Sequence, residues 1–429
     1  MSILGCTKSG FMLCIGICLV LVALNNISQP EERTSILSEI KECGYYPGEL
    51  CKALFEGKSA ALVVANVCQE ALTPSKKPAP NILEPKTNCS TLIKELHLIT
   101  KPLSEEEAGY PLAFIMTIHK NLEMFLKLLT AIYAPQNIYC IHIDQKSPNA
   151  FSQAVQRVAH CLPNIFISAK QETVVYAGIS RLQADLNCME DLVRSDAPWS
   201  HVINLCGQDF PIRTNREIIR YLKSKWNRKN LTPGVIQPDH MKYRTQVSYK
   251  EFVHKGTSYV YPTKEEKGGP PYNITLYFGT AYYALTRDFV QFVLTDEQAK
   301  DLLEWSKDTY SPDEHYWVTL NRIQGAPGST PEAGWEGNIR AIKWRDQEGK
   351  SHSGCNGHYV RDICVYGLGD LQWLTDSPHL YANKFDPHRY PLVTDCLERQ
   401  FRQKVLNGAE VPIEQDWYFP DEYTLKTDL

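Results

Sequence analysis

Apolar and polar residues follow two different patterns along the chain, and the change comes near Tyr110. From that point on, short apolar runs rich in β-forming residues alternate with segments whose apolar residues recur every three or four positions. The runs predict buried strands, and the recurring spacing predicts amphipathic helices. The predicted strands are 111–119, 137–144, 164–168 and 201–206, and the predicted helices are 122–133, 155–162, 178–193 and 215–225.

This order of elements predicts an α/β fold. Strands and helices that alternate at this spacing form a mostly parallel sheet with helices on both faces. Ligands of such sheets bind beyond the carboxyl ends of the strands. His119, Asp144 and the turn at 207–211 are therefore expected on the binding edge.

Residues 26–108 have a different pattern of apolar and polar residues, with charged clusters, a proline-rich stretch at 73–80 and no long apolar periodicity. We interpret them as a stem before a domain at 109–429. The cysteines at 43, 51, 68 and 89 indicate that parts of this stem are held by disulfides.

The N-terminal segment predicts contact with a lipid bilayer. Residues 10–24 are an uninterrupted apolar run of about 15 residues that follows Lys8. About 20 are typical of a membrane span, but shorter spans suit the thinner membranes of the secretory pathway. We predict a cytoplasmic tail at 1–9 and a signal anchor at 10–25. A cleaved signal peptide and a buried helix are the alternatives.

The cysteines and glycosylation sequons also indicate the secretory pathway. Of 14 cysteines, three lie in or beside the apolar run, and the eleven others include no C-x-x-C pair typical of zinc sites. In an oxidising compartment they predict up to five disulfides and one free thiol. N-glycosylation sequons occur at Asn88, Asn230 and Asn273, and the one at Asn26 lies too near the membrane. A net charge of −4 gives no basic surplus for nucleic acid.

The candidate chemistry is the neutralisation of a phosphate group by protein side chains, without a metal ion. Asp209 follows the fourth predicted strand alone, and the chain has no Asp-x-Asp. A single carboxylate is a poor metal cage, so no metal site is predicted. Arg and Lys side chains would then meet a diphosphate, and Arg361 and Lys384 are the candidates. Asp144 either holds a ribose or base edge or caps a turn.

Residues 311–317 predict the start of a helix. Ser311 is the expected N-cap, Pro312 is the first helical residue, and Glu314 completes a capping box. Local capping explains these residues without a function. The alternative is that Glu314 points into a cleft and takes a proton from an acceptor hydroxyl.

Several strings resemble the core 2 and I-branching β-1,6-N-acetylglucosaminyltransferase family. They are Tyr-Cys-Ile-His-Ile-Asp at 139–144, Asn-Leu-Cys-Gly-Gln-Asp-Phe-Pro-Ile at 204–212, Tyr-Ser-Pro-Asp-Glu at 310–314, Val-Arg at 360–361 and Ala-Asn-Lys-Phe at 382–385. The resemblance covers about residues 51–405. It implies a Golgi type II membrane protein with a GT-A catalytic domain, a Rossmann-like mixed sheet flanked by helices. It also implies an inverting enzyme that uses UDP-N-acetylglucosamine without a divalent metal and forms β-1,6 linkages on galactose- or N-acetylgalactosamine-containing glycans of glycoproteins.

The resemblance assigns site residues. Glu314 matches the catalytic base, and Arg361 and Lys384 match the pair that neutralises the UDP diphosphate. The positions that match contacts to the uridine end are Thr117, His119, Asp144 and Tyr176.

The acceptor side departs from the family pattern. Where core 2 enzymes have a Glu, a Lys and an Arg, this chain has Thr232, His240 and Tyr243, and Arg244 is adjacent to the last. Of the family's Trp-x-Tyr pair, Trp344 is kept and the Tyr is lost. These changes leave the acceptor glycan open.

The resemblance also implies four disulfides, which pair Cys51 with Cys396, Cys89 with Cys161, Cys140 with Cys188 and Cys355 with Cys364. Cys206 is then free, and Cys43 and Cys68 are left to pair with each other. The assembly, monomer or homodimer, stays open.

Two other functions remain. A non-catalytic family member would bind a UDP-sugar, a glycan or another transferase, although Glu314, Arg361 and Lys384 are all present. A xylosyltransferase-like enzyme would transfer another sugar, because that branch shares the Cys-Gly-x-Asp-Phe-Pro pattern of residues 206–211.

Overall fold

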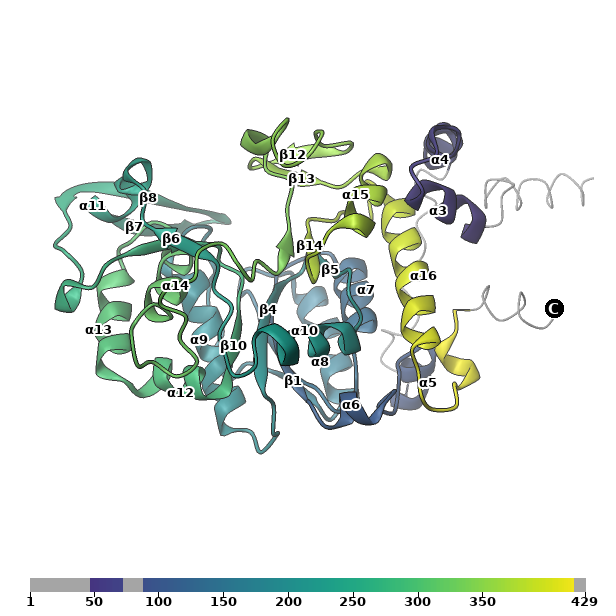
Figure 1. Cartoon of the computed structure of the whole chain (residues 1–429), viewed down its shortest axis with the longest axis horizontal. Helices are drawn as coiled ribbons and strands as arrows, with labels where there is room; N and C mark the ends of the chain where they lie inside the picture. The colour runs from purple at the N-terminus through teal and green to yellow at the C-terminus, as the bar shows by residue number, and fades with distance from the viewer. Residues whose placement is uncertain (1–46, 72–87, 420–429) are drawn as a thin grey trace, which may run out of the picture. The chain divides into compact units, whose positions relative to one another are not determined.

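The computed structural model describes residues 47–71 and 88–419 (Figure 1). The chain divides into two compact units near Ser75. The first unit contains α3 (Pro47–Phe55) and α4 (Ser59–Ala71), which contact each other. The sequence analysis missed both helices. The predicted anchor at 10–25 lies outside the described residues. Among the helices that are described, none combines the length and the apolar character needed to cross a bilayer.

The second unit is built on a five-stranded mixed sheet with the strand order β10-β4-β1-β2-β3. The first four strands along the chain are parallel to their neighbours, and β10 pairs with β4 in the antiparallel direction. The predicted α/β fold and all four predicted strands are confirmed. Their bounds are β1 Leu112–Ile118, β2 Ile138–Ile143, β3 Ile165–Ile167, β4 His201–Cys206 and β10 Ala284–Thr286.

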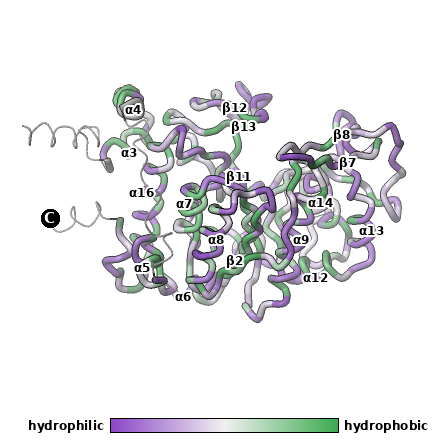
Figure 2. Tube along the Cα trace, turned by 180° about the vertical axis from the view of Figure 1, so that it is seen from behind, coloured by the Kyte–Doolittle hydropathy of each residue, from purple (hydrophilic) through white to green (hydrophobic). Residues whose placement is uncertain are grey.

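Two hydrophobic cores lie on opposite faces of this sheet. Phe114 and Met116 of β1 belong to one core, whereas Ala113 and Ile115 belong to the other, as the two-residue repeat of a strand requires. Figure 2 shows apolar residues gathered on the strands and on the sheet-facing sides of helices such as α7. Helices of the first face are α7 (Leu122–Ile132), α8 (Asn149–Cys161) and α10 (Asn215–Lys225); those of the second are α9 (Ile179–Arg194), α12 (Arg287–Thr295), α13 (Glu297–Ser306) and α14 (Tyr316–Leu320).

The four predicted helices of this domain are present as α7, α8, α9 and α10. Local chemistry fixes two of their starts. The Asn121 side chain accepts from the Met124 N–H at the start of α7. Thr214 and Glu217 form a complete capping box at the start of α10. Helix α8 begins six residues earlier than the predicted 155, because Phe151 is the one large apolar residue between Asn149 and Ala154 and shows no period alone.

The folded domain begins before the predicted boundary at 108. Helix α5 (Cys89–Glu95) and the turn after it place Leu92, Leu96 and Leu98 in the first core, and α6 (Glu105–Ala108) follows. The prediction that the stem reaches residue 108 is therefore wrong. A helix of seven residues has too few apolar positions to show a period.

Smaller elements lie beyond the carboxyl ends of the parallel strands. A three-stranded sheet joins β5 (Asp209–Pro211), β14 (Tyr381–Asn383) and β11 (Arg340–Ala341), and thereby connects the turn after β4 to the segment with Lys384. The remaining pairs and helices are β6 (Gly234–Ile236) with β9 (Tyr277–Gly279), β7 (Val247–His254) with β8 (Thr257–Glu266), β12 (His358–Val360) with β13 (Ile363–Val365), α11 (Tyr243–Gln246), α15 (Leu371–Asp376) and α16 (Pro391–Asn407).

Three of the predicted disulfides are present, and they are Cys89–Cys161, Cys140–Cys188 and Cys355–Cys364. Cys51 and Cys396 are each disulfide-bonded, and their pairing with each other stays a prediction. Cys206 is free, as predicted. Cys43 lies outside the described residues.

Candidate active site

Glu314 ends a short 3₁₀ turn, Pro312–Glu314, just before α14. Ser311 has a φ of 48° and makes no side-chain cap, so the predicted capping box is wrong. The Glu314 N–H, which the box would have given to the Ser311 hydroxyl, donates instead to the Ser311 carbonyl at 3.0 Å. The Glu314 side chain is 27% exposed. Burial raises the pKa of its carboxyl, which suits a general base that must hold a proton briefly near neutral pH.

Arg244 is the direct partner of this carboxyl. Its Nη1 donates to Glu314 Oε2, and the guanidinium lowers the pKa of Glu314 against the effect of burial. The guanidinium lies 5.1 Å from the Phe278 ring and 5.3 Å from the Tyr310 ring, and its Nε donates to the Tyr243 hydroxyl at 3.2 Å. An aromatic cage therefore holds the one cation that contacts the candidate base.

Tyr176 links this base to the candidate phosphate cations. The Ser311 N–H donates to the Ala177 carbonyl at 2.8 Å, which brings the loop of Tyr176 beside the turn of Glu314. The Arg361 guanidinium lies 4.0 Å from the Tyr176 ring centre. Burial raises the pKa of the Tyr176 hydroxyl, and the negative charge of Glu314 raises it further. The loop of Tyr176 thus lies beside the turn of the base, and the Tyr176 ring lies against Arg361.

Arg361 and Lys384 come from neighbouring segments that are bonded to each other. Arg361 occupies the turn between β12 and β13, and Lys384 directly follows β14. The Lys384 N–H donates to the Cys364 carbonyl at 3.3 Å, and its Nζ lies 3.4 Å from the Val360 carbonyl oxygen. The predicted pair is therefore brought together.

The charge around these two side chains is positive and uncompensated. Burial lowers the pKa of Lys384, and the charges of Arg361 and Lys120 lower it further. His119, at the end of β1, has its pKa lowered by burial and then by Lys120. Within the part of the chain that is described, neither Arg361 nor Lys384 forms an ion pair with a carboxylate. Such a cluster is chemically suited to a polyvalent anion.

Two of the predicted donor contacts have structural roles instead. Thr117 is buried, and its hydroxyl donates to Asp185 at 3.3 Å. Asp144 is 5% exposed and accepts from the Lys146 and Val174 N–H groups and from the Lys146 ammonium. Asp144 therefore fixes the loop that leads to Tyr176, which is the turn-capping alternative, and its carboxylate has little surface left for a ribose.

Asp209 is not available as a metal ligand. It is fully buried, and it accepts from the Cys206 N–H at 2.7 Å and the Asn383 amide at 2.8 Å. The Arg340 guanidinium lies 3.3 Å away and neutralises it. The residues therefore do not fit a divalent ion beside Asp209.

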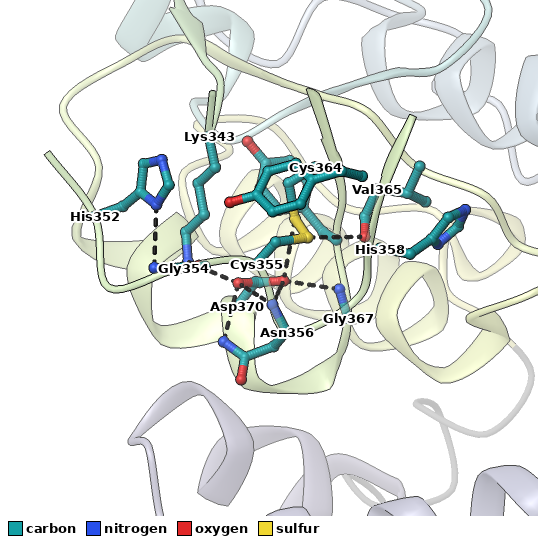
Figure 3. Close-up of a disulfide and its surroundings, with 12 residues drawn as sticks. Lys343, His352, Gly354, Cys355, Asn356, His358, Cys364, Val365, Gly367 and Asp370 are labelled. Carbon is teal, nitrogen blue, oxygen red and sulfur yellow. Dashed lines mark hydrogen bonds and ion pairs between the residues drawn. A yellow bond between two sulfur atoms is a disulfide. The ribbon is translucent and has the colours of Figure 1, made fainter. Parts of the chain in front are cut away.

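One cluster of three potential metal ligands occurs among the described residues, namely Cys355, Cys364 and Asp370. The two sulfurs are bonded to each other, and the Asp370 carboxylate is bonded to Lys343 and Gly367 (Figure 3). The carboxylate accepts from Lys343 Nζ at 2.6 Å and from the Gly367 N–H at 2.9 Å. A disulfide and a saturated carboxylate leave no ligand set, so this cluster is structural.

The predicted acceptor residues separate into two groups. Thr232 is buried, and its hydroxyl accepts from Asn321 Nδ2 at 2.7 Å and Arg322 Nη1 at 3.2 Å. The prediction that it contacts the acceptor is therefore wrong. His240, Tyr243 and Arg244 lie on one short segment that reaches Glu314 through Arg244.

Trp344 lies on the donor side. It is half-buried and forms a β-bridge with Ile363, directly after the turn of Arg361. It therefore belongs to the same small subdomain as the candidate phosphate cations. Its predicted acceptor contact stays a prediction.

The sequons also differ. Asn88 and Asn273 are exposed, as glycosylation requires. Asn230 is fully buried, and its amide nitrogen donates to Asn321 Oδ1 at 2.9 Å and to the Pro327 carbonyl at 2.8 Å. A glycan on that nitrogen would break both bonds and has no room. The prediction of glycosylation at Asn230 is therefore wrong for this fold.

Sequence reasoning missed Lys120 and Arg340. Lys120 lies beside His119 at the predicted binding edge, so its position was a usable signal. Arg340 has the apolar neighbours Ile339, Ala341 and Ile342, but further charges at 343, 345 and 346 made it look like one of several surface cations. Its partner, Asp209, is far away in the sequence, so no local pattern indicates the pair.

Comparisons with known proteins agree with this geometry. A family model described as "Branch: Core-2/I-Branching enzyme" matches residues 112–375. The chain is 56% identical over 98% of its length to a human protein named "Probable beta-1,3-galactosyl-O-glycosyl-glycoprotein beta-1,6-N-acetylglucosaminyltransferase 7", of which it covers 98%. It is 53% identical over 86% of its length to a human "N-acetyllactosaminide beta-1,6-N-acetylglucosaminyl-transferase", of which it covers 89%. It is 45% identical over 76% of its length to a rat "Beta-1,3-galactosyl-O-glycosyl-glycoprotein beta-1,6-N-acetylglucosaminyltransferase 3", of which it covers 75%.

Proposed function

Because the chain belongs to the Core-2/I-Branching enzyme family, we propose that it is a β-1,6-N-acetylglucosaminyltransferase that uses UDP-N-acetylglucosamine and inverts the anomeric carbon. One observation carries the proposal. The loop of Tyr176 is bonded to the turn that holds the candidate base Glu314, and the guanidinium of the unpaired cation Arg361 lies 4.0 Å from the Tyr176 ring centre. An inverting transfer needs this arrangement, with a base on the acceptor side and positive charge on the side of the leaving group.

On the acceptor side, Glu314 takes the proton of the attacking hydroxyl. The oxygen then forms a bond to the anomeric carbon as the bond to UDP breaks. Burial makes the Glu314 carboxylate more basic than an exposed one, and Arg244 keeps it ionised until the acceptor arrives. Such a base typically contributes about 10²–10⁴ to the rate.

On the donor side, Arg361 and Lys384 stabilise the charge that develops on the departing diphosphate. Both are held by bonded backbone before any ligand binds, so little reorganisation is needed during the reaction. His119 and Lys120 add positive charge at the end of β1.

The same residues support metal independence. In a metal-dependent transferase a carboxylate after the fourth strand would hold the ion under the diphosphate. Here Asp209 is neutralised by Arg340 and bonded by Asn383. Positive charge comes instead from the side chains of the protein. No cofactor is part of this proposal.

We propose a galactose- or N-acetylgalactosamine-containing glycan of a glycoprotein as the acceptor. The relatives named for this chemistry act on N-acetyllactosaminide or on β-1,3-galactosyl-O-glycosyl-glycoprotein. The buried position of Thr232 removes one contact that the resemblance to core 2 enzymes implied. N-acetyllactosamine chains therefore stand beside O-glycans as the acceptor.

We further propose that the protein is a single-pass type II membrane protein of the Golgi, anchored by residues 10–25, with its catalytic domain in the lumen. Three disulfides and two exposed sequons support an oxidising, glycosylating compartment.

The test is transfer by the purified full-length protein in EDTA. The donor is UDP-N-acetylglucosamine, and the acceptors are a panel of O-glycans and poly-N-acetyllactosamines. Linkage analysis should find a β-1,6 branch on at least one acceptor. UDP binding without product on any acceptor would favour the non-catalytic function. Transfer from UDP-xylose alone would favour another sugar donor.

A further inference from the structure

The turn that presents Arg361 has an unfavourable backbone. In the β12–β13 hairpin Val360 pairs with Ile363, so Arg361 and Asp362 form a two-residue loop. Their φ values are 51° and 61°. Two left-handed residues define a type I′ turn, which normally contains Asn, Asp or Gly. Asp tolerates this backbone and Arg rarely adopts it, so contacts from outside the turn must hold Arg361 there.

Arg345 supplies these contacts. Its N–H donates to the Asp362 carbonyl at 2.9 Å, and its Nε donates to Asp362 Oδ1 at 3.1 Å. Its guanidinium lies 4.4 Å from the Tyr359 ring centre, and the Tyr359 hydroxyl donates to Glu348 at 3.0 Å. The side chain of Arg345 is thus fixed on one side by a ring and bonded on the other to the turn.

The base of the hairpin is fixed independently of Arg345. Figure 3 shows the Cys355–Cys364 disulfide beside the buried Asp370 carboxylate, which accepts from Lys343. The Cys364 N–H donates to the Lys343 carbonyl at 3.0 Å. A rigid base and a strained tip imply that the tip is the part whose conformation depends on Arg345.

We propose that Arg345 is a positioning residue for the donor diphosphate: it acts through Asp362 to hold Arg361 in the left-handed turn that presents the Arg361 guanidinium beside Tyr176. The proposal rests on the proposed function, in which Arg361 binds the diphosphate. The side chains of Arg345 and Asp362 are 58% and 71% exposed. The role of this exposed ion pair is to position Arg361. An exposed ion pair of this kind contributes little to global stability.

The rival explanation is that Arg345 attracts the donor by its own charge. The two explanations differ in how Arg345 depends on Asp362. Glycine adopts a left-handed backbone without cost and is favoured at the second position of a type I′ turn. Asp362→Gly should therefore keep the turn without help from Arg345, whereas Asp362→Ala should lose the bond and keep the strain.

The experiment is a double-mutant cycle on the full-length protein. UDP is titrated by calorimetry, and KM for UDP-N-acetylglucosamine and kcat are measured. If the competent turn falls to a fifth or a tenth of the population, affinity falls by about fivefold to tenfold. We expect that loss for Arg345→Ala, Arg345→Lys and Asp362→Ala. The melting temperature and the KM for acceptor should stay unchanged.

Asp362→Gly should stay within about twofold of the wild type, and Arg345→Ala should have no further effect in the Asp362→Gly background. Lys350→Ala, which removes another exposed cation of the same subdomain, is the matched control and should have no effect. An equal loss from Arg345→Ala in both backgrounds, or normal affinity for Arg345→Lys, would overturn the positioning role.

Hydrogen exchange of peptides that cover 358–365 separates this proposal from the function itself. Without ligand, Arg345→Ala should speed exchange at the hairpin tip, and Asp362→Gly should suppress that difference. This result is expected even if the wild type fails to bind UDP, which would refute the donor site alone. Unchanged exchange in Arg345→Ala would refute the positioning role alone.

Discussion

The proposed donor half of the site, with Arg361 and Lys384, and the proposed acceptor half, with Glu314 and Arg244, are built differently. Arg361 and Lys384 lie on backbone segments that are bonded to each other, and no carboxylate of the described residues pairs with them. Glu314, by contrast, already has a partner, Arg244. The donor half is ready for an anion before the anion arrives. In the acceptor half, Glu314 and Arg244 form an ion pair without net charge. The acceptor hydroxyl must reach Glu314 within this pair.

This difference shows which part of the chemistry is preorganised. Charge stabilisation of a leaving group is most effective when the cations do not have to move. A base, however, needs a partner that keeps it ionised and can still give way. Two departures from the core 2 pattern, His240 and Tyr243, also fall on the segment that reaches Glu314.

The largest expected effect comes from removing the base. Glu314→Gln keeps the shape of the side chain but cannot take a proton, so kcat should fall by about 10²–10⁴. UDP affinity should stay within about twofold, because the donor half does not use this carboxylate. Steady-state kinetics and calorimetry measure the two quantities. A parallel loss of UDP binding would show that the halves are not separate.

The next largest effect comes from the donor cations. Arg361→Ala and Lys384→Ala should each reduce kcat/KM by about 10²–10³ and weaken UDP binding. When kcat/KM is measured for UDP-N-acetylglucosamine at a saturating acceptor concentration, the change reports the donor site alone. The Glu314 pH dependence should remain in both variants. A normal UDP affinity in either one would remove that residue from the diphosphate site.

Asp313, which is buried and directly precedes Glu314, allows the acceptor half to be tested through the free energy of unfolding. Burial raises the pKa of its carboxyl to about 7. The folded state therefore binds this proton more tightly than the unfolded state, and the contribution of Asp313 to stability falls as pH rises from about 4 to about 7. Asp313→Asn should remove that loss.

Urea unfolding of wild type and Asp313→Asn at pH 5 and pH 8 measures this effect. The variant should gain about 2–3 kcal/mol relative to wild type between the two pH values. An unchanged difference would mean that Asp313 is ionised in the folded protein throughout that range.

Arg244→Ala should have the smallest effect of the four. Arg244 lowers the pKa of Glu314, so its loss should raise that pKa and move the acidic limb of the kcat profile to higher pH. The kcat of Arg244→Ala should therefore fall below that of the wild type on the acidic side of the limb and equal it well above the limb. Arg244→Lys should restore part of the shift. A limb that stays in place or moves to lower pH would contradict the pairing.

The sequence predicted the central sheet well, because buried parallel strands leave unbroken apolar runs. Every residue of β1 is buried, and the run at 111–119 marks that strand almost to the residue. Helices outside the central sheet, among them α3, α4, α5 and α16, were not predicted, and the domain boundary failed with the first three. Short elements gain their order from contacts, which a local pattern does not record.

In the site, the sequence predicted residue types and missed partners. Arg361 and Lys384, predicted as a pair, lie on segments that are bonded to each other, and the roles of both and of Glu314 stay predictions. The partners Arg244, Arg340 and Arg345 depend on contacts between distant segments. The same limit explains Asn230 and Thr232, whose sequon looked exposed and is buried under the loop around Pro327 and Asn321. Burial of a polar residue is set by the fold, so spacing alone did not predict it.

The central claim is that protein cations replace a metal in the donor half. The most direct measurement is calorimetric titration of UDP into the full-length protein, first in EDTA and then with saturating Mn²⁺. The account predicts the same dissociation constant in both buffers, and a weaker one for Lys384→Ala in both. Binding that appears only with Mn²⁺ would contradict it.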